Sequence, residues 1–126
     1  MNNNIENILI GASHSDSEAV AFLQDNLMNV ELFEEILSIV EDEEQCDARL
    51  GGAFWISQFN SAVISKYENR LLDLLDEELD SVTAHIMMSL AKMKSRKGIT
   101  YIIQNRITPV LYWEGKALEE YLNETN

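Results

Sequence analysis

Two stretches of this chain share one alternation of apolar and acidic residues, and that echo constrains the fold more than any other feature. Residues 35–43 (EILSIVEDE) align without a gap with residues 70–78 (RLLDLLDEE), apolar with apolar and, over the last three positions, acid with acid. A second apolar segment follows each, and three pairs match there at a slightly shorter offset: Leu50 with Val82, Phe54 with Ile86 and Ser57 with Ser89. Such spacing is typical of paired-helix repeat units. The pattern predicts two successive helical hairpins with acidic turns.

The first helix of the first hairpin, residues 30–43, has the clearest amphipathic pattern. At about 100° per residue, its apolar positions fill one half-circle: Leu32, Phe33, Ile36, Leu37, Ile39 and Val40. The other half is polar: Glu31, Glu34, Glu35, Ser38 and Glu41. We expect a surface helix with one buried face.

The chain contains one proline and five glycines in 126 residues, too few breaks for a many-turned β fold. We therefore predict a single all-α domain, a HEAT-like stack of antiparallel helical hairpins, with an irregular helical bundle as the alternative. Its parts are two N-terminal cap helices in residues 1–28 and hairpin units at 30–59, 61–94 and 98–123.

Local signals place the ends of these helices. Expected ends or caps are Gly11, Ser15, Asp47, Ser65, Asp80 and Pro109, with a basic turn at residues 95–98. The helix over residues 48–59 has apolar residues pointing in several directions, as expected of a helix between neighbours. Its Gly51-Gly52 pair costs about 1 kcal/mol per glycine relative to alanine, and we expect a close backbone approach in return.

The net charge of −13 is unevenly distributed. Residues 1–48 hold twelve acids and no lysine or arginine, whereas residues 81–113 hold five bases and no acid. Such a field repels nucleic acid and anionic membranes and attracts basic partners. The alternative is that the acids only keep the protein in solution.

Cysteine use and hydropathy predict a cytoplasmic protein. The single cysteine, Cys46, allows no internal disulfide, and the N-terminus has neither the basic nor the apolar region of a signal peptide. No apolar run approaches the roughly 20 residues of a membrane span.

Residues with catalytic or metal-binding chemistry are few, so we expect neither an enzyme nor a cofactor or metal site. Neither His14 nor His85 has a glutamate three residues before it, as a di-iron bundle requires, and a half-buried structural role is expected for His85. Acids around Cys46 oppose a reactive thiolate. The acidic turns lack the ligand spacing of a calcium-binding EF-hand loop, and no glycine-rich phosphate loop or small-molecule site is recognised.

The basic run Lys92, Lys94, Arg96 and Lys97 is the one feature typical of RNA binding. Bases at the C-terminal end of a helix also complement its dipole, and the rest of the chain is acidic. RNA association is therefore the minority interpretation, and no direct nucleic-acid partner is expected.

The two acidic turns, together with the size, charge and helical pattern of residues 30–123, resemble the HEAT-like immunity proteins of bacterial contact-dependent growth inhibition and other polymorphic toxin systems. The resemblance implies stoichiometric occlusion of a cognate toxin domain, often a basic nuclease. As a hypothesis, the acids of both turns and the first helix meet its lysines and arginines, with Tyr112 as an apolar anchor. These partner-binding candidates are Glu31, Glu34, Glu35, Glu41, Asp42, Glu43, Glu44, Asp76, Glu77, Glu78 and Tyr112. The alternative is a HEAT-like adaptor that binds another protein.

Overall fold

The computed structural model describes residues 2–42, 46–76 and 81–98, which are helical apart from turns and contain no strand. The α-helices are α1 (Asn2–Ser13), α2 (Ser17–Gln24), α3 (Val30–Glu41), α4 (Cys46–Gln58), α5 (Ser61–Ile64), α6 (Glu68–Asp73) and α7 (Ser81–Lys92). Two 3₁₀ turns belong to the helical segment that begins with α5. η1 (Ser65–Tyr67) separates α5 from α6, and η2 (Leu74–Asp76) follows α6. The prediction of an all-α fold is confirmed. The helices expected over residues 99–106 and 109–123, and the cap at Asp80, lie outside the described residues.

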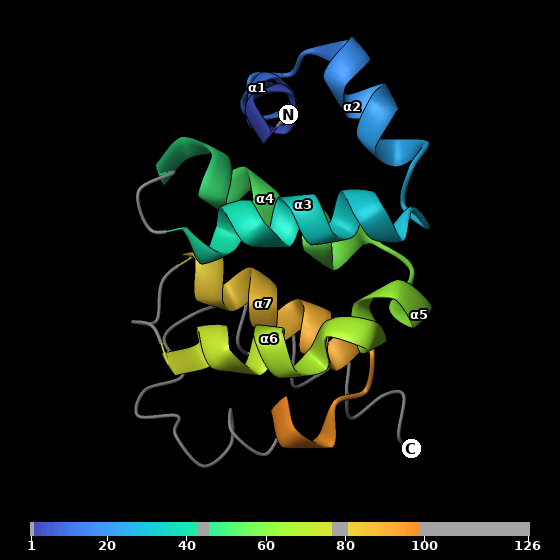
Figure 1. Cartoon of the computed structure of the whole chain (residues 1–126), viewed down its shortest axis with the longest axis vertical. Helices are drawn as coiled ribbons and strands as arrows, with labels where there is room; N and C mark the ends of the chain where they lie inside the picture. Colours follow the sequence, from blue (N-terminus) through green and yellow to red (C-terminus); the bar gives the residue numbers. More distant parts are fainter. Residues whose placement is uncertain (1, 43–45, 77–80, 99–126) are drawn as a thin grey trace.

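The helices form successive rows (Figure 1). α1 and α2 lie at one end of the long axis, α3 and α4 form the next row, and α6 and α7 follow. α4 packs against α1, α3 and α7, so it is a helix between neighbours, as predicted. The rows are consistent with stacked hairpins. A HEAT-like identity remains a prediction.

The end of α1 and the start of α2 differ from the prediction. α1 continues through Gly11 to Ser13, and the left-handed residue that ends it is Ser15, with φ of 68°. The amide of Asp16 donates to the Gly11 carbonyl at 2.9 Å, a helix-ending pattern. The cap of α2 is Asp16 and not Ser15, because the Asp16 carboxylate accepts from the amides of Glu18 and Ala19. α2 ends at Gln24, four residues before Met28, where a longer helix was expected.

α3 has the predicted buried face. Asn29 caps it by accepting from the Leu32 amide at 3.1 Å, and the helix ends at Glu41. All six predicted apolar residues are buried: Leu32, Phe33, Ile36, Leu37, Ile39 and Val40.

α4 begins at Cys46, so Asp47 lies within its first turn and does not precede it as predicted. The glycine pair lies against neighbouring helices, with backbone nearest to Gly51 at an ordinary contact distance and side chains nearest to Gly52. A Cβ added to Gly51 would lie 3.4 Å from the backbone oxygen of Leu9 in α1. One added to Gly52 would lie 2.9 Å from Cγ2 of Val40 in α3. The inward side of α4 therefore carries small residues, and neighbouring helices approach it closely.

The helical segment from α5 to η2 is capped by Asn60, which accepts a hydrogen bond from the Ala62 amide at 2.8 Å. The predicted helix cap at Ser65 is wrong, because the Ser65 hydroxyl donates to the Ala62 carbonyl of the preceding turn and does not accept from a following amide. One side of this segment is buried: Ile64, Leu71, Leu74 and Leu75 are buried and Tyr67 is half-buried.

α7 ends at Lys92, and Lys94, two residues later, is left-handed, with φ of 59°. Ser95, only 2% exposed, donates through Oγ to the Glu68 carboxylate at 2.5 Å and accepts from the Gly98 amide at 2.9 Å. Residues 96–98 are helical, where a basic turn without helix was predicted. A Cβ on Gly98 would lie 2.9 Å from Cβ of Leu90, so this turn packs directly on α7.

The predicted pairing of the second helices is wrong in register. Leu50 and Phe54 are exposed, whereas their proposed counterparts Val82 and Ile86 are buried. Burial recurs instead at an offset of 34 (82 − 48, 86 − 52, 90 − 56), which pairs Ala48 with Val82, Gly52 with Ile86 and Ile56 with Leu90. In the first helices the offset is 35 (71 − 36, 75 − 40), pairing buried Ile36 with Leu71 and Val40 with Leu75. The two hairpins thus repeat their burial pattern at nearly one spacing.

Candidate protein-binding surface

The outward face of α3 presents four of the predicted binding residues. Glu31, Glu34 and Glu41 are exposed and Glu35 is half-buried, because the opposite side of the helix is buried in the core. Asp42, also exposed, follows the helix at its C-cap. The structure therefore gathers these five acids on and just beyond one helix.

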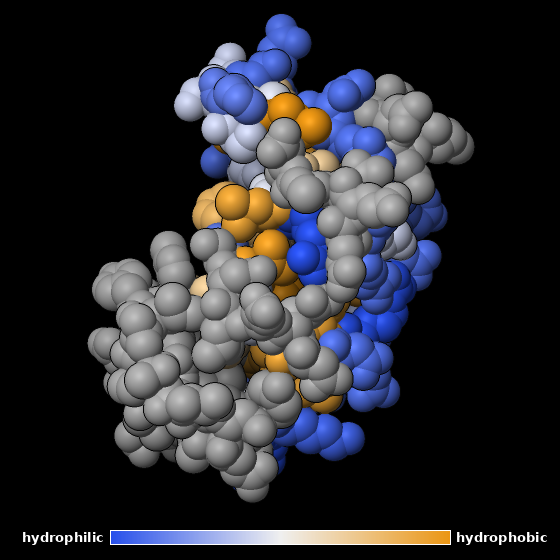
Figure 2. Space-filling view, turned by 90° about the vertical axis from the view of Figure 1, so that its left-hand side faces the viewer, coloured by the Kyte–Doolittle hydropathy of each residue, from blue (hydrophilic) through white to orange (hydrophobic). Residues whose placement is uncertain are grey.

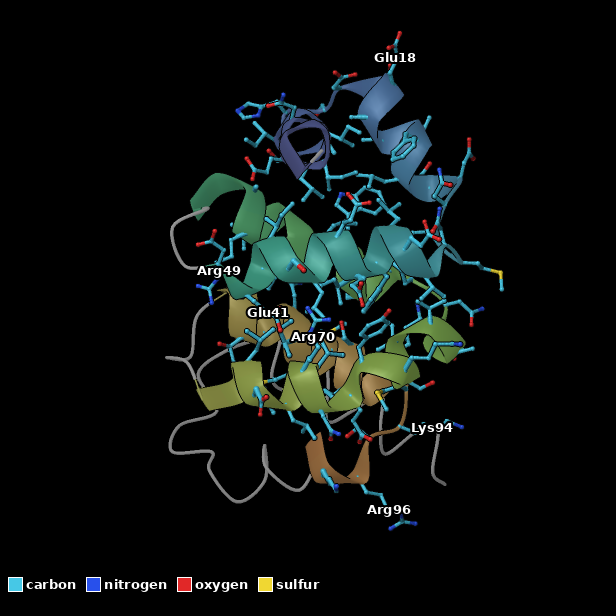
Figure 3. The ribbon with its side chains drawn as sticks, viewed as in Figure 1. Glu18, Glu41, Arg49, Arg70, Lys94 and Arg96 are labelled. Atoms are coloured by element: carbon cyan, nitrogen blue, oxygen red, sulfur yellow. The ribbon has the colours of Figure 1, made fainter. Side chains whose placement is uncertain are left out.

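A base from the second hairpin joins this face. Nη2 of Arg70 in α6 lies 2.6 Å from Oε1 of Glu41, and its Nε donates to Oε2 of the same carboxylate at 3.0 Å. Nη1 of Arg70 lies 3.7 Å from Glu34. Figure 3 shows Glu41 and Arg70 pointing toward each other from the two rows. The pair links the hairpins and neutralises part of the negative charge that the sequence predicted here.

Tyr67 completes this contact between the rows. Its ring lies 4.9 Å from that of Phe33, its hydroxyl donates to Glu34 at 3.5 Å, and the Arg70 guanidinium lies 5.7 Å from its ring centre. Burial, followed by the charge and hydrogen bond of Glu34, raises the pKa of Tyr67 above its ordinary value. The hydrogen bond to Glu41 raises the pKa of Arg70 above its ordinary value, and arginine is already charged at every physiological pH without this shift.

The C-terminal end of α3 is joined to α4 by a second arginine. Nε of Arg49 donates to the carbonyl oxygen of Val40 at 2.6 Å, where a cation complements the negative end of the helix dipole. This bond holds the start of α4 against the end of α3, which carries Glu41 and is followed by Asp42.

The other predicted binding residues cannot be placed on this surface. Glu43, Glu44, Glu77, Glu78 and Tyr112 lie outside the described residues, as does the side chain of Asp76. That the acids of both turns meet the partner therefore stays a prediction.

Two features of the surface escaped the sequence reasoning. Arg70 aligned with Glu35 in the repeat, and nothing in the sequence indicated that it would pair with Glu41. The sequence predicts a helix over residues 48–59 that is packed between neighbours, yet Leu50 and Phe54 are 44% and 41% exposed. Their spacing of four residues, on a helix whose other side carries Gly51 and Gly52, was the available signal.

His85 has the structural environment that the sequence predicted. It is half-buried on α7 and its ring centre lies 5.7 Å from that of Phe54 in α4. Burial lowers its pKa below the ordinary value of 6.5. Among the described residues, no group of three or more histidine, cysteine or acidic side chains is placed to hold a metal ion.

The apolar segments among the described residues are short. No helix in residues 2–42, 46–76 or 81–98 has the length and hydropathy needed to cross a bilayer.

Comparison with known protein families, with curated proteins and with solved structures finds no match to this chain.

Proposed function

We propose that this chain is a cytoplasmic immunity protein, without catalytic activity of its own, that binds a cognate bacterial toxin domain and blocks it. The observation that carries the proposal is the acidic outward face of α3, in a chain of net charge −13 whose first 48 residues contain no lysine or arginine. Such a face favours a basic partner, and a nuclease domain is basic because it binds phosphates.

The proposed mechanism is occlusion. Negative charge on α3 accelerates the encounter with a cationic surface, and close packing then supplies residence time. Glu41 is already bonded to Arg70 and Glu34 lies near it, so Glu31 and Glu35 contribute most of the attraction of α3.

Coexpression tests the function directly. The probe is the toxin domain encoded beside the gene for this chain, produced in bacteria with and without the protein. We expect growth arrest by the toxin alone, rescue by coexpression and a one-to-one complex on size-exclusion chromatography. Absence of both rescue and complex would exclude an immunity role and favour the adaptor alternative.

The surface is tested by two matched pairs of neutralising substitutions. Glu31→Gln with Glu35→Gln removes two charges from α3, and Glu18→Gln with Asp25→Asn removes two from α2 and its cap. We expect the α3 pair to slow toxin association roughly fivefold at low salt and the α2 pair to have a smaller effect. At high salt the two pairs of substitutions should give the same rate of toxin association. Equal effects at low salt would show that only the total charge matters.

A further inference from the structure

Two exposed positions on the outward side of α4 are apolar, and core packing does not account for them. At the corresponding outward positions α3 carries glutamate and serine, as a helix facing water should. α4 instead exposes Leu50 and Phe54, one turn apart, at 44% and 41%. Because Gly51 and Gly52 bring its inward side close to α1 and α3, these two large side chains remain outside.

Phe54 is held in place although it is exposed. Its ring meets those of Trp55 and His85 edge-on, with ring centres 5.3 and 5.7 Å away. Trp55 is 8% exposed and His85 belongs to α7, so the contacts fix the ring against two helices. An aromatic side chain that is already ordered loses little conformational entropy on binding, which is the property of an interface anchor.

The charge beside this apolar pair is negative. The bond from Arg49 to the Val40 carbonyl places the turn that carries Leu50 next to the end of α3. The chain from residue 41 to residue 50 contains five acids and one base, Arg49. Figure 2 views the edge where α3 ends and α4 begins, and shows apolar atoms at mid-height beside hydrophilic ones. An apolar anchor bordered by acids complements a cationic surface that carries an apolar side chain.

From this arrangement we infer that Leu50 and Phe54 form the apolar anchor of the partner-binding surface. The occupant is a segment of a basic protein in which one large aromatic or aliphatic side chain is flanked by lysine or arginine. The inference deepens the function proposed above and rests on it for the basic protein partner. It moves the centre of the interface from α3 alone to the edge shared by α3 and α4.

Three capped pentapeptides probe the surface without the toxin. Each contains a central residue and four flanking residues: tryptophan between lysines, serine between lysines, and tryptophan between glutamates. Titration into the isotope-labelled protein, followed by nuclear magnetic resonance, reports both affinity and location. We expect the lysine-flanked tryptophan peptide to bind roughly tenfold tighter than the other two, since only it combines both interactions. Its shift changes should centre on Leu50, Phe54 and His85.

Two alanine variants and one matched control identify the anchor. Leu50→Ala and Phe54→Ala should each reduce the affinity for this peptide several-fold, whereas Phe22→Ala should not. Phe22 is also 41% exposed but lies on α2. Thermal unfolding of each variant separates lost binding from lost structure, and Leu50→Ala, with no ring contact to lose, covers the case in which Phe54→Ala unfolds. Equal binding of both lysine peptides, or unchanged affinity in Leu50→Ala, would overturn the inference.

The toxin complex distinguishes the two proposals. If the toxin domain binds equally well to the wild type and to Leu50→Ala, the anchor is wrong and the immunity function stands. If no toxin domain binds but the peptide does so at Leu50 and Phe54, the immunity function fails and the surface assignment stands.

Discussion

Gly52 is the residue whose identity the packing constrains most directly. An added Cβ would lie 2.9 Å from Val40 Cγ2 and 3.3 Å from Ile36 Cγ2, both core atoms of α3. At Gly51 the nearest atom would be 3.4 Å away, an ordinary contact. Both substitutions gain the same helix propensity, so their difference reports the overpacking alone.

We therefore predict that Gly52→Ala is less stable than Gly51→Ala by about 1–3 kcal/mol, measured by denaturant unfolding. Equal stabilities of the two variants would show that α3 can move away from α4 at no cost.

The second prediction at this scale concerns His85 and pH. Since burial lowers its pKa in the folded protein, the unfolded chain takes up the proton first as the pH falls through 6.5. Stability due to this group is complete above that pH and is lost on acidification until the pH passes below the folded pKa. We expect the free energy of unfolding to fall more between pH 7.5 and 5.5 in the wild type than in His85→Gln. Identical pH dependence in the two proteins would contradict this.

Among the elements, the contact between α3 and α6 depends on a charged pair that is partly open to water. The side chains of Arg70 and Glu41 retain 36% and 34% of their exposure, so solvent and salt weaken the attraction. A double-mutant cycle with Arg70→Ala and Glu41→Ala should give a coupling of about 0.5–1 kcal/mol at low salt and less in 1 M NaCl. The more distant pair of Arg70 with Glu34 is the control. A coupling energy of equal size there would mean that the distance to Arg70 does not determine the coupling energy.

The periodicity of the sequence was sufficient to predict elements but not their partners. The buried face of α3 was correct to the residue because one side is apolar and the other acidic. α4 is apolar on both sides, so periodicity could not show that Leu50 and Phe54 face outward. The observed helix ends differ from the predicted ones by a few residues. Ser15 and Asp16, for example, can both cap a helix, and only the backbone conformation decides between them. The pairing of Arg70 with Glu41 joins residues 29 positions apart, and no local pattern encodes it.

For the whole molecule, the net charge of −13 acts against the compact state, because like charges come closer together on folding. Raising NaCl from 10 to 200 mM shortens the screening length from about 30 Å to less than 10 Å. We predict that this raises the free energy of unfolding by about 1 kcal/mol, measured by urea denaturation at fixed pH. A fall in stability with salt would instead mean that internal pairs such as Arg70 with Glu41 outweigh the general repulsion.

The position of α4 between α1, α3 and α7 also affects how the chain emerges during synthesis. Until α7 has left the ribosome, the side of α4 that α7 covers has no partner among the helices already made. A nascent chain that ends before Ser81 therefore exposes apolar surface from a hairpin that is otherwise complete. Translation up to that point produces an aggregation-prone intermediate. The rate at which residues 81–92 are synthesised determines how long this intermediate persists.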